Sequence, residues 1–381
     1  MKLSSFFNIR PLAPSLFPFI LNNRIQTLST ITVPETMKIE KLIRTQTDVG
    51  LRIMKALFLN EGKKSNIVYS PLSIHVVLSL IASQSTAHLN LLASKIVPLV
   101  FADGSPIDRT ILSFANGHWV DKSTPLKPFF KEVVYRFYKS VDNLTRLIFA
   151  NALYFKGVWD DKFDASETKE YDFNRINGKS SVKVPFMTNY KNQYLEAFDC
   201  FKVLKLNYEK GENEEWHFSM CVFLPDEKDG LPTLVDRVCS ELGFLNRHLP
   251  RQKVKMGDFR IPKFNIAFGF EASTILKDLG PVLSFHVDLY KGGNLIEMVN
   301  SPLGETPSIF GVLHKSFIEV NEEGTEAAVV TAIEIIVEAL HPYHPPKMID
   351  FEANHLFLFF LREETNGAVL FIGQVLNLLE G

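Results

Sequence analysis

The spacing of apolar residues changes along the chain, from helical in the first part to strand-like in the second half. From Met37 to Leu59 the apolar positions recur at largely helical intervals, which predicts one amphipathic helix. A second, mostly buried helix is expected to begin at Pro71, because proline is tolerated in the first turn of a helix. Helices should therefore dominate the first part of the chain.

Strand-like patterns take over further along. The apolar run 144–159 predicts a buried central strand, and short β-type runs alternate with turns in 182–225 and 253–268. A final hairpin is predicted from Phe351–Leu361 and Ala368–Val375. No internal repeat is visible, and the predicted fold class is α+β in one large domain.

The composition is that of a globular protein. Of 381 residues, 46% are hydrophobic and 22% are charged, and the formal net charge of -2 gives no basic excess for nucleic acid. No apolar run approaches the roughly 20 residues that cross a bilayer, so we expect no membrane span. Cys200, Cys221 and Cys239 have no CxxC spacing, so they predict neither a disulfide scaffold nor a zinc site and favour a reducing compartment.

Residues 1–36 differ from the rest of the chain. Their charged side chains are basic up to the first acidic residue, Glu35, and Ser, Leu, Phe and Pro fill much of the stretch. This composition resembles a transit-type leader, and the alternatives are a disordered tail or an upstream extension with Met37 as the effective start. The folded domain is expected to span 37–381. The expected compartment is the cytoplasm or an organelle, and the extracellular space is the alternative.

Motifs of catalysis and metal binding are not found in the sequence. It contains no GxSxG, HExxH or Walker A motif and no GxGxxG followed by a helix, so we expect no enzyme. His341 and His344 have no third ligand nearby, and Pro342 and Tyr343 between them suggest an exposed loop. We therefore expect no metal and no cofactor.

The stretch NEEGTEAAVVTAIEIIVEALHPYHPPK, 321–347, combines two conformational preferences. Its first half suits a helix or hinge, whereas Thr331–Val337 is rich in β-branched residues and suits a strand. Counted as a strand of about 14 residues, roughly 46 Å long at ~3.3 Å per residue, it has one face without charge. That face comprises Thr325, Ala327, Val329, Thr331, Ile333, Ile335 and Val337. The opposite face carries Glu326, Glu334 and Glu338; an amphipathic helix is the alternative, although it would segregate these charges poorly.

Several segments of the chain carry a family resemblance. GVLHKSFIEVNEEGTEAAV, 311–329, resembles the strand and proximal hinge of the serpins, the serine protease inhibitor superfamily, in its plant form. SNIVYSPLSI, FANALYFKGVW, RIPKFNIAFGFEASTILKDLG and FEANHLFLFFLREETNGAVLFIGQVLNL also look like serpin segments, in the same order. The resemblance implies a large central β-sheet with additional sheets and surrounding helices, and a monomer that inhibits serine or papain-like cysteine endopeptidases.

The resemblance also implies a mechanism. A reactive-centre loop, here about 324–349, is offered to the protease and after cleavage inserts as a new strand into the central sheet, distorting the acyl-enzyme before water can release it. The hinge of this loop would be Glu322, Glu323, Gly324, Thr325, Glu326, Ala327, Ala328, Val329 and Val330.

Two further groups of residues match family positions. A polar "shutter" beneath the sheet would comprise Ser70, Ser73, Asn151 and His314, and a "breach" at the top of the insertion path would comprise Trp159 and an ion pair of Lys263 with Glu322. We expect His314 within hydrogen-bonding distance of Asn151 or Ser70. The alternatives are a helix cap for Ser70 and ordinary core packing for Trp159.

Two departures bear on activity. YKSVDN runs straight into LTRLIFANALYFKGVW, where the family has an edge strand of the central sheet and a helix lying across that sheet, so we expect both to be missing. The hinge also carries Val329 and Val330, whose branched side chains add bulk and stiffness where small residues favour rapid insertion. We therefore expect weak inhibition, and the alternative is a non-inhibitory serpin acting as a protease substrate or binding protein.

The cleaved bond is ambiguous in the sequence. The loop is longer than in plant relatives and rich in proline, and Leu356 replaces the usual proline after His355. Spacing from the hinge selects Glu338 and Ala339, whereas charge chemistry favours Lys347 and Met348.

Overall fold

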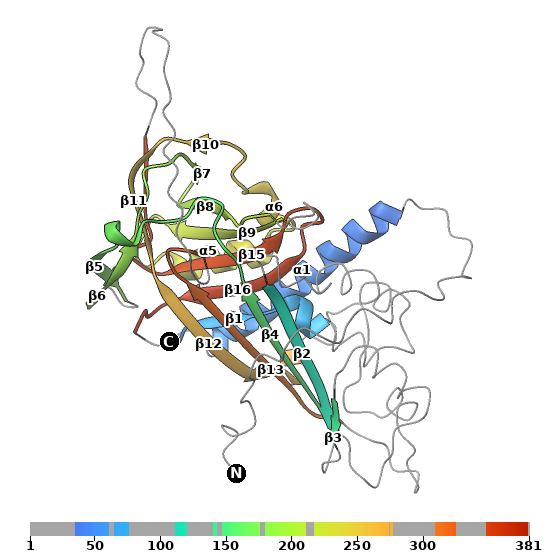
Figure 1. The fold of residues 1–381 in the computed structure, drawn as a ribbon. Coiled ribbons are helices and arrows are strands. Elements are labelled where there is room, and N and C mark those ends of the chain that lie inside the picture. The colour runs from blue at the N-terminus through green and yellow to red at the C-terminus, as the bar shows by residue number, and fades with distance from the viewer. Residues whose placement is uncertain are drawn as a thin grey trace, which may run out of the picture.

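The structure, a computed structural model, describes residues 35–60, 65–75, 111–119, 140–142, 147–175, 180–210, 217–273, 275–276, 309–324 and 348–379. These residues form three β-sheets with helices packed against them, as expected for an α+β protein (Figure 1). The leader predicted in 1–36 lies almost entirely outside the described residues. No described helix has the length and apolar character needed to span a membrane.

A five-stranded sheet contains the strands that concern function. Its order is β12-β13-β4-β2-β3, with bounds Phe264–Glu271, Ile309–Val320, Leu147–Lys156, Ile111–Trp119 and Ser140–Asp142. Figure 1 shows β12, β13, β4 and β2 as long neighbouring strands. In the centre β4 and β13 pair directly with each other and run parallel, and every other long pair in this sheet is antiparallel.

The edge of this sheet corrects one expectation. The edge strand predicted to be missing is present as β3, three residues that pair in parallel with β2. The prediction was wrong because these residues lie inside YKSVDN itself, where so short a strand leaves no apolar pattern. Only the four residues 143–146 separate β3 from β4, about 6 Å of helix at ~1.5 Å per residue, so a helix across the sheet has no room between these strands.

The seven-stranded sheet lies between two layers of the hydrophobic core. Its order is β1-β16-β15-β9-β8-β7-β10, with bounds Ile67–Tyr69, Val369–Val375, Phe357–Glu363, Phe218–Pro225, Phe201–Asn207, Gln193–Phe198 and Lys253–Val254. Side chains of β15 alternate between two core layers: Leu358 and Phe360 enter one layer, and Phe357, Phe359 and Leu361 enter the other. Because both faces are covered, β9, β15 and β16 are buried throughout.

The helices cover one face of this sheet. Three helices contribute to the core layer on this face: α1, Glu35–Asn60; α5, Leu231–Ser240; and α6, Phe244–Arg247. Their buried side chains in this layer include Val49 and Ile53 of α1 and Leu234 of α5. The helix predicted from Met37 is therefore confirmed. Residues 71–75 are helical from Pro71 onward, as predicted.

A four-stranded sheet completes the fold and corrects the predicted final hairpin. Its order is β14-β11-β6-β5, with bounds Ile349–Glu352, Met256–Pro262, Ser181–Met187 and Lys169–Asn174; the short helix η2, Ala165–Glu167, precedes β5. The strand predicted over Phe351–Leu361 is in fact two strands, because the chain turns after Glu352 and enters a different sheet at Phe357. The apolar pattern is nearly continuous across this turn, so periodicity alone did not reveal it.

Candidate functional site

A tight turn lies at the end of β13, next to the point where β4 ends. Asn321 and Gly324 exchange two backbone hydrogen bonds of 3.2 Å, and Gly324 also forms an antiparallel bridge with Val158. Gly324 has φ +110, and a Cβ there would collide with the carbonyl oxygen of Gly157 and lie 2.7 Å from the amide nitrogen of Trp159. Only glycine fits this position, between the ends of the two central strands.

Backbone and side-chain donors from residues 159–163 hold the turn in place. The amides of Trp159 and Phe163 donate to the carbonyls of Glu323 and Glu322, each at 2.9 Å, and Trp159 Nε1 donates to Asn321 at 2.9 Å. The indole is 1% exposed and stacks on Tyr208 with ring centroids 4.3 Å apart. Trp159 is therefore core, as the alternative stated, and at the same time it binds the turn directly.

The carboxylate of Glu322 is the charged centre of this turn. Lys263 Nζ lies 2.7 Å from Glu322 Oε2, and the Thr168 hydroxyl donates to Oε1 at 2.8 Å. Burial alone would raise the pKa of Glu322, but the hydrogen bonds from Lys263 and Thr168 and the lysine charge outweigh it, so the pKa lies below its usual range. The predicted ion pair is present; its role in loop insertion stays a prediction.

Thr168 was missed by the sequence analysis. It follows η2, immediately before β5, and is 154 positions from Glu322 in the chain. No local pattern marks it, because its partner is set by tertiary folding.

A buried polar cluster lies under the junction of β4 and β13. The Ser70 amide donates to His314 Nε2 at 3.1 Å, and Ser316 Oγ lies 2.7 Å from the same nitrogen. Because Nε2 accepts from an amide it carries no proton, so the Ser316 hydroxyl must donate to it. Burial lowers the pKa of His314 to about 3, which keeps the ring neutral.

The expected contact of His314 with Ser70 is thus confirmed. Ser70 Oγ also accepts from the Ser73 amide at 3.1 Å, so the serine caps the helix as well. The side chain of Asn151 lies outside the described residues, but its backbone is paired directly opposite His314 in the β4–β13 ladder. Ser316 was not predicted; the signal available was its place two residues after His314 on the same face of a strand.

The remaining predicted site residues are mostly outside the described ranges. These are Thr325, Glu326, Ala327, Ala328, Val329, Val330, Glu338, Ala339 and Lys347. Met348, the first described residue after the gap, is 57% exposed.

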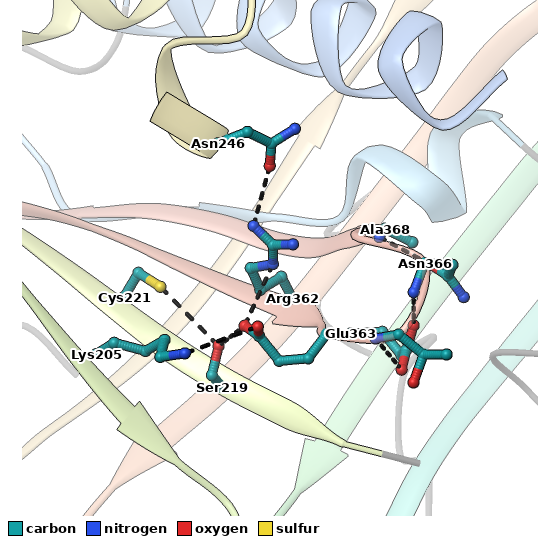
Figure 2. A network of polar contacts seen from close by, with 10 residues as sticks. Lys205, Ser219, Cys221, Asn246, Arg362, Glu363, Asn366 and Ala368 are labelled. Atoms are coloured by element: carbon teal, nitrogen blue, oxygen red, sulfur yellow. Dashed lines mark hydrogen bonds and ion pairs between the residues drawn. The ribbon is translucent and has the colours of Figure 1, made fainter. Parts of the chain in front are cut away.

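A second polar cluster lies at the end of the β15–β16 hairpin (Figure 2). Arg362 donates to Asn246 at 3.0 Å and lies 3.3 Å from Glu364, which also contacts Lys205 and Ser219. The charges of Arg362 and Lys205 are both paired with that of Glu364. Burial raises the pKa of the neighbouring Cys221 thiol to about 12. This cluster offers no ionised nucleophile, and its contacts serve to fasten the hairpin to β9 and α6.

Comparisons with known proteins agree with the geometry. A family model described as Serpin (serine protease inhibitor) matches residues 137–378. Serpin-ZX of Arabidopsis thaliana is 40% identical over 396 aligned positions, covering 90% of this chain and 99% of that protein. Serpin-ZX of Hordeum vulgare is also 40% identical, over 401 positions covering 90% of this chain and 98% of the relative.

Solved structures give the same result. Arabidopsis AtSerpin1, in its native stressed conformation, is 38% identical with a TM-score of 0.78, covering 90% of this chain and 99% of that one. Tenebrio molitor Serpin48, at 21% identity and a TM-score of 0.68, shares the fold.

The alignment lengths also record missing sequence. Ninety per cent of this chain is about 343 residues, whereas the alignment with the Arabidopsis relative runs over 396 positions, so about 50 positions of the relative face gaps in this chain. This agrees with the lack of room for a helix between β3 and β4. With matched sequence over most of its length and the fold in common, this chain belongs to the serpin family of serine protease inhibitors.

Proposed function

We propose that this chain offers residues 324–349 to serine or papain-like cysteine endopeptidases as a cleavable loop, and that it is cleaved as a substrate more often than it traps the enzyme. The place of the loop rests on the direct pairing of β4 with β13, together with the bridges of Gly324 to Asn321 and Val158. The preference for cleavage over trapping rests on the bulk of Val329 and Val330 and on the missing helix. A strand continuing from Gly324 would run antiparallel to both β4 and β13 and would separate them.

The two bridges define the register of such a strand. Counting back along β13 from Asn321 places Thr331 beside His314. Counting back along β4 from Val158 places the same Thr331 beside Asn151, which already pairs with His314. Insertion in this register preserves the alignment of β4 with β13, so neither strand has to slide.

The same register decides which loop side chains would enter the core. The buried side chains of β13 are Val312, His314, Ser316, Ile318 and Val320. Their partners in the inserted strand would be the uncharged residues Ile333, Thr331, Val329, Ala327 and Thr325. Glu326 and Glu334 would lie on the face of the exposed Lys315. An inserted strand would therefore bury no charge, which removes the main cost of insertion.

The length of the sheet favours one of the two candidate bonds. Leu147, the first residue of β4, would lie beside Ile335, so the sheet ends about three residues before Glu338. A cut between Glu338 and Ala339 would bring an attached protease close to the far end of the sheet. A cut after Lys347 would leave 12 residues beyond Ile335, about 40 Å of chain at ~3.3 Å each, between the end of the sheet and the attached protease. Insertion would then not press the protease against the end of the sheet. We therefore propose Glu338–Ala339 as the bond that matters for trapping.

Two features support substrate behaviour. Trapping requires insertion to be faster than hydrolysis of the acyl-enzyme. Val329 would enter the core beside Ser316, where its branched side chain is restricted at χ1, and Val330 adds stiffness on the other face. The missing helix also favours substrate behaviour. Without a helix lying across it, the five-stranded sheet is less protected against insertion of the loop before cleavage and against aggregation.

The test is incubation of the purified protein with trypsin-like and papain-like enzymes, followed by denaturing gels and an assay of free protease. We expect cleaved loop and active enzyme. A stable higher-mass complex at near-equimolar ratio would overturn the substrate proposal, and first cleavage within 182–225 would overturn the loop proposal. Mass spectrometry of the released C-terminal peptide identifies the bond, since it starts at Ala339 or at Met348.

A further inference from the structure

One edge of the five-stranded sheet is the strand β12, which lies on the outer side of β13 (Figure 1). β12 has eight residues and pairs with β13 without a register shift, and it contains no proline and no charged residue before Glu271. The residues exposed on its outer face are Asn265, Ala267 and Gly269. Proteins usually protect an edge strand of this length with lysine, proline or a bulge, because it can otherwise pair with another chain.

The other edge strands that the structure describes do have such protection. β5, at the edge of the four-stranded sheet, has the exposed charged residues Lys169, Glu170 and Asp172. The remaining edge strands, β1, β3, β10 and β14, have four residues or fewer. Among the described edges, β12 alone is both long and uncharged along its outer face.

The backbone groups on the free side of β12 belong to its odd-numbered residues. Just beyond the strand, the Ala272 amide donates to the Val312 carbonyl of β13 at 2.7 Å, in register with the β12–β13 ladder. Bonding alternates along an antiparallel strand, so the even-numbered residues bond to β13 and the odd-numbered ones point away from it. The Lys263 amide fits this alternation, because it bonds away from β13, to Pro185 at 2.9 Å. No described residue bonds to the outward amides and carbonyls of Asn265, Ala267 and Gly269.

These free groups match those of a second copy of the same strand. In an antiparallel pair with a two-fold axis at Ala267, odd-numbered residues of one copy face odd-numbered residues of the other, so their backbone groups can bond. Ala267 would face Ala267 of the second copy, and Asn265 would face Gly269. Glu271 would face Lys263, so opposite charges would meet at both ends of the pair. A shift of two residues would place Glu271 beside Asn265, or Lys263 beside Gly269, and would lose this match.

The inner face of β12 also suits this pairing. Phe268 is only partly buried, although it packs against both hydrophobic clusters of the core. In the two-fold register it would lie beside Ile266 of the second copy, which would remove more of the ring from water. Lys263 already contacts Glu322 at 2.7 Å, so its charge serves mainly to select the register, and the backbone bonds and Phe268 supply most of the affinity.

We propose that two copies of this chain associate through β12, so that their five-stranded sheets join into one sheet across a two-fold axis. This corrects the expectation of a monomer that the resemblance implies. One strand pair buries less than the roughly 800 Å² per partner of a standard interface, so the dimer is weak. It is also closed, because the pairing uses the free edge of both copies. The inference does not rest on the proposed function, because β13 separates β12 from the junction where the loop would insert.

Sedimentation velocity of the uncut, full-length chain from about 1 to about 100 µM tests the association. The unchanged protein should shift from monomer to dimer over this range. Ala267→Lys puts like charges directly opposite each other on the axis and should raise the dissociation constant at least about tenfold. Ala165→Lys, at an exposed alanine of η2, adds the same charge away from β12 and should leave the constant unchanged. Equal constants for the two variants, or a monomer at every concentration, would overturn the proposal.

Cysteine cross-linking tests the register in a Cys200→Ser background, which removes the exposed native thiol. Ala267→Cys should form a covalent dimer with oxidised glutathione, because facing Cα atoms in a bonded antiparallel pair are about 5.5 Å apart, within the span of a disulfide. Asn265→Cys is the matched control. Its two copies would be offset by four residues, about 13 Å at ~3.3 Å each, and should not cross-link. Equal cross-linking of the two variants would overturn the two-fold pairing.

Loop cleavage separates this dimer from another possible occupant of the edge. The β12 pairing should persist after the loop is cut. Assemblies larger than a dimer that disappear on loop cleavage would show that the loop of a neighbouring molecule occupies the edge, and would overturn the proposal. The proposed function stands or falls separately, on the cleavage and trapping measured with proteases.

Discussion

The two ends of the proposed loop are attached in different ways. The N-terminal end, the turn Asn321–Gly324, is fixed by backbone bonds, and the side chain of Glu322 in it is 11% exposed beside Lys263. The C-terminal end, β14, is an edge strand whose ion pair, Arg260 with Glu352, is 27% and 30% exposed. One end lies in the interior between two strands, and the other lies on the surface of a separate sheet.

Because of this difference, substitutions at the two ends should have different effects. At the N-terminal end, insertion in the bridged register breaks none of the bonds of the turn, because Gly324 is already aligned with both flanking strands. What insertion must break is the β4–β13 ladder. At the C-terminal end, β14 is held at the edge of a separate sheet, where its ion pair is more exposed. We therefore expect substitutions in the turn to lower the stability of the fold more than substitutions near β14 do.

The largest effect is expected for Gly324→Ala. A side chain at φ +110 is strained and would collide with the Gly157 carbonyl oxygen, so the free energy of unfolding should fall by about 3 kcal/mol. Gly243→Ala is the matched control: its φ of +67 is also left-handed, but the nearest atom lies 3.7 Å away, so we expect a loss of about 1 kcal/mol. Denaturant unfolding measures both, and equal losses would contradict a close fit at the turn.

The ion pairs at the two ends provide the next comparison. Glu322→Gln weakens a buried contact with Lys263 and Thr168 and should cost about 2 kcal/mol of unfolding free energy. Glu352→Gln weakens a more exposed contact with Arg260 and should cost less than about 1 kcal/mol. Urea titrations of the two variants measure both losses of unfolding free energy. A larger loss for Glu352→Gln would contradict the claim that the turn is held more strongly than β14.

The pH dependence of stability tests whether His314, on β13, is buried as a neutral ring. His314 has a folded pKa of about 3 against an ordinary 6.5, so the unfolded chain binds a proton that the folded chain does not. Its contribution to stability is complete above pH 6.5 and falls by about 2 kcal/mol by pH 5. His75, whose pKa burial also lowers to about 3, adds a similar loss. Unfolding measured across this range should therefore have a shallower pH dependence in His314→Gln, and an unchanged slope would mean that His314 is not buried as a neutral ring.

The smallest change in stability is expected in the hinge. Replacing Val329 and Val330 with alanine should alter the stability of the intact protein by less than about 0.5 kcal/mol if these residues are outside the sheet before cleavage. The fraction of protease trapped as a covalent complex should nevertheless rise several-fold, because a less bulky hinge inserts sooner. Densitometry of denaturing gels measures the fraction. An unchanged fraction would show that the missing helix, rather than hinge bulk, limits trapping.

The sequence predicted the contacts that lie within recognisable segments. The pair Lys263–Glu322 and the contact of Ser70 with His314 were both predicted in this way, and the α+β class followed from periodicity. Thr168 was not predicted, because its partner Glu322 is 154 positions away in the chain and no local pattern marks the contact. β3 was missed because three residues carry too little pattern to indicate a strand.

The most direct test of the central claim is a crystal structure of the protein after cleavage of its loop. Loop insertion predicts a six-stranded sheet in which Thr331 lies between His314 on β13 and Asn151 on β4, with the uncharged face of the loop toward the core. A cleaved protein in which β4 and β13 still pair directly with each other would contradict it.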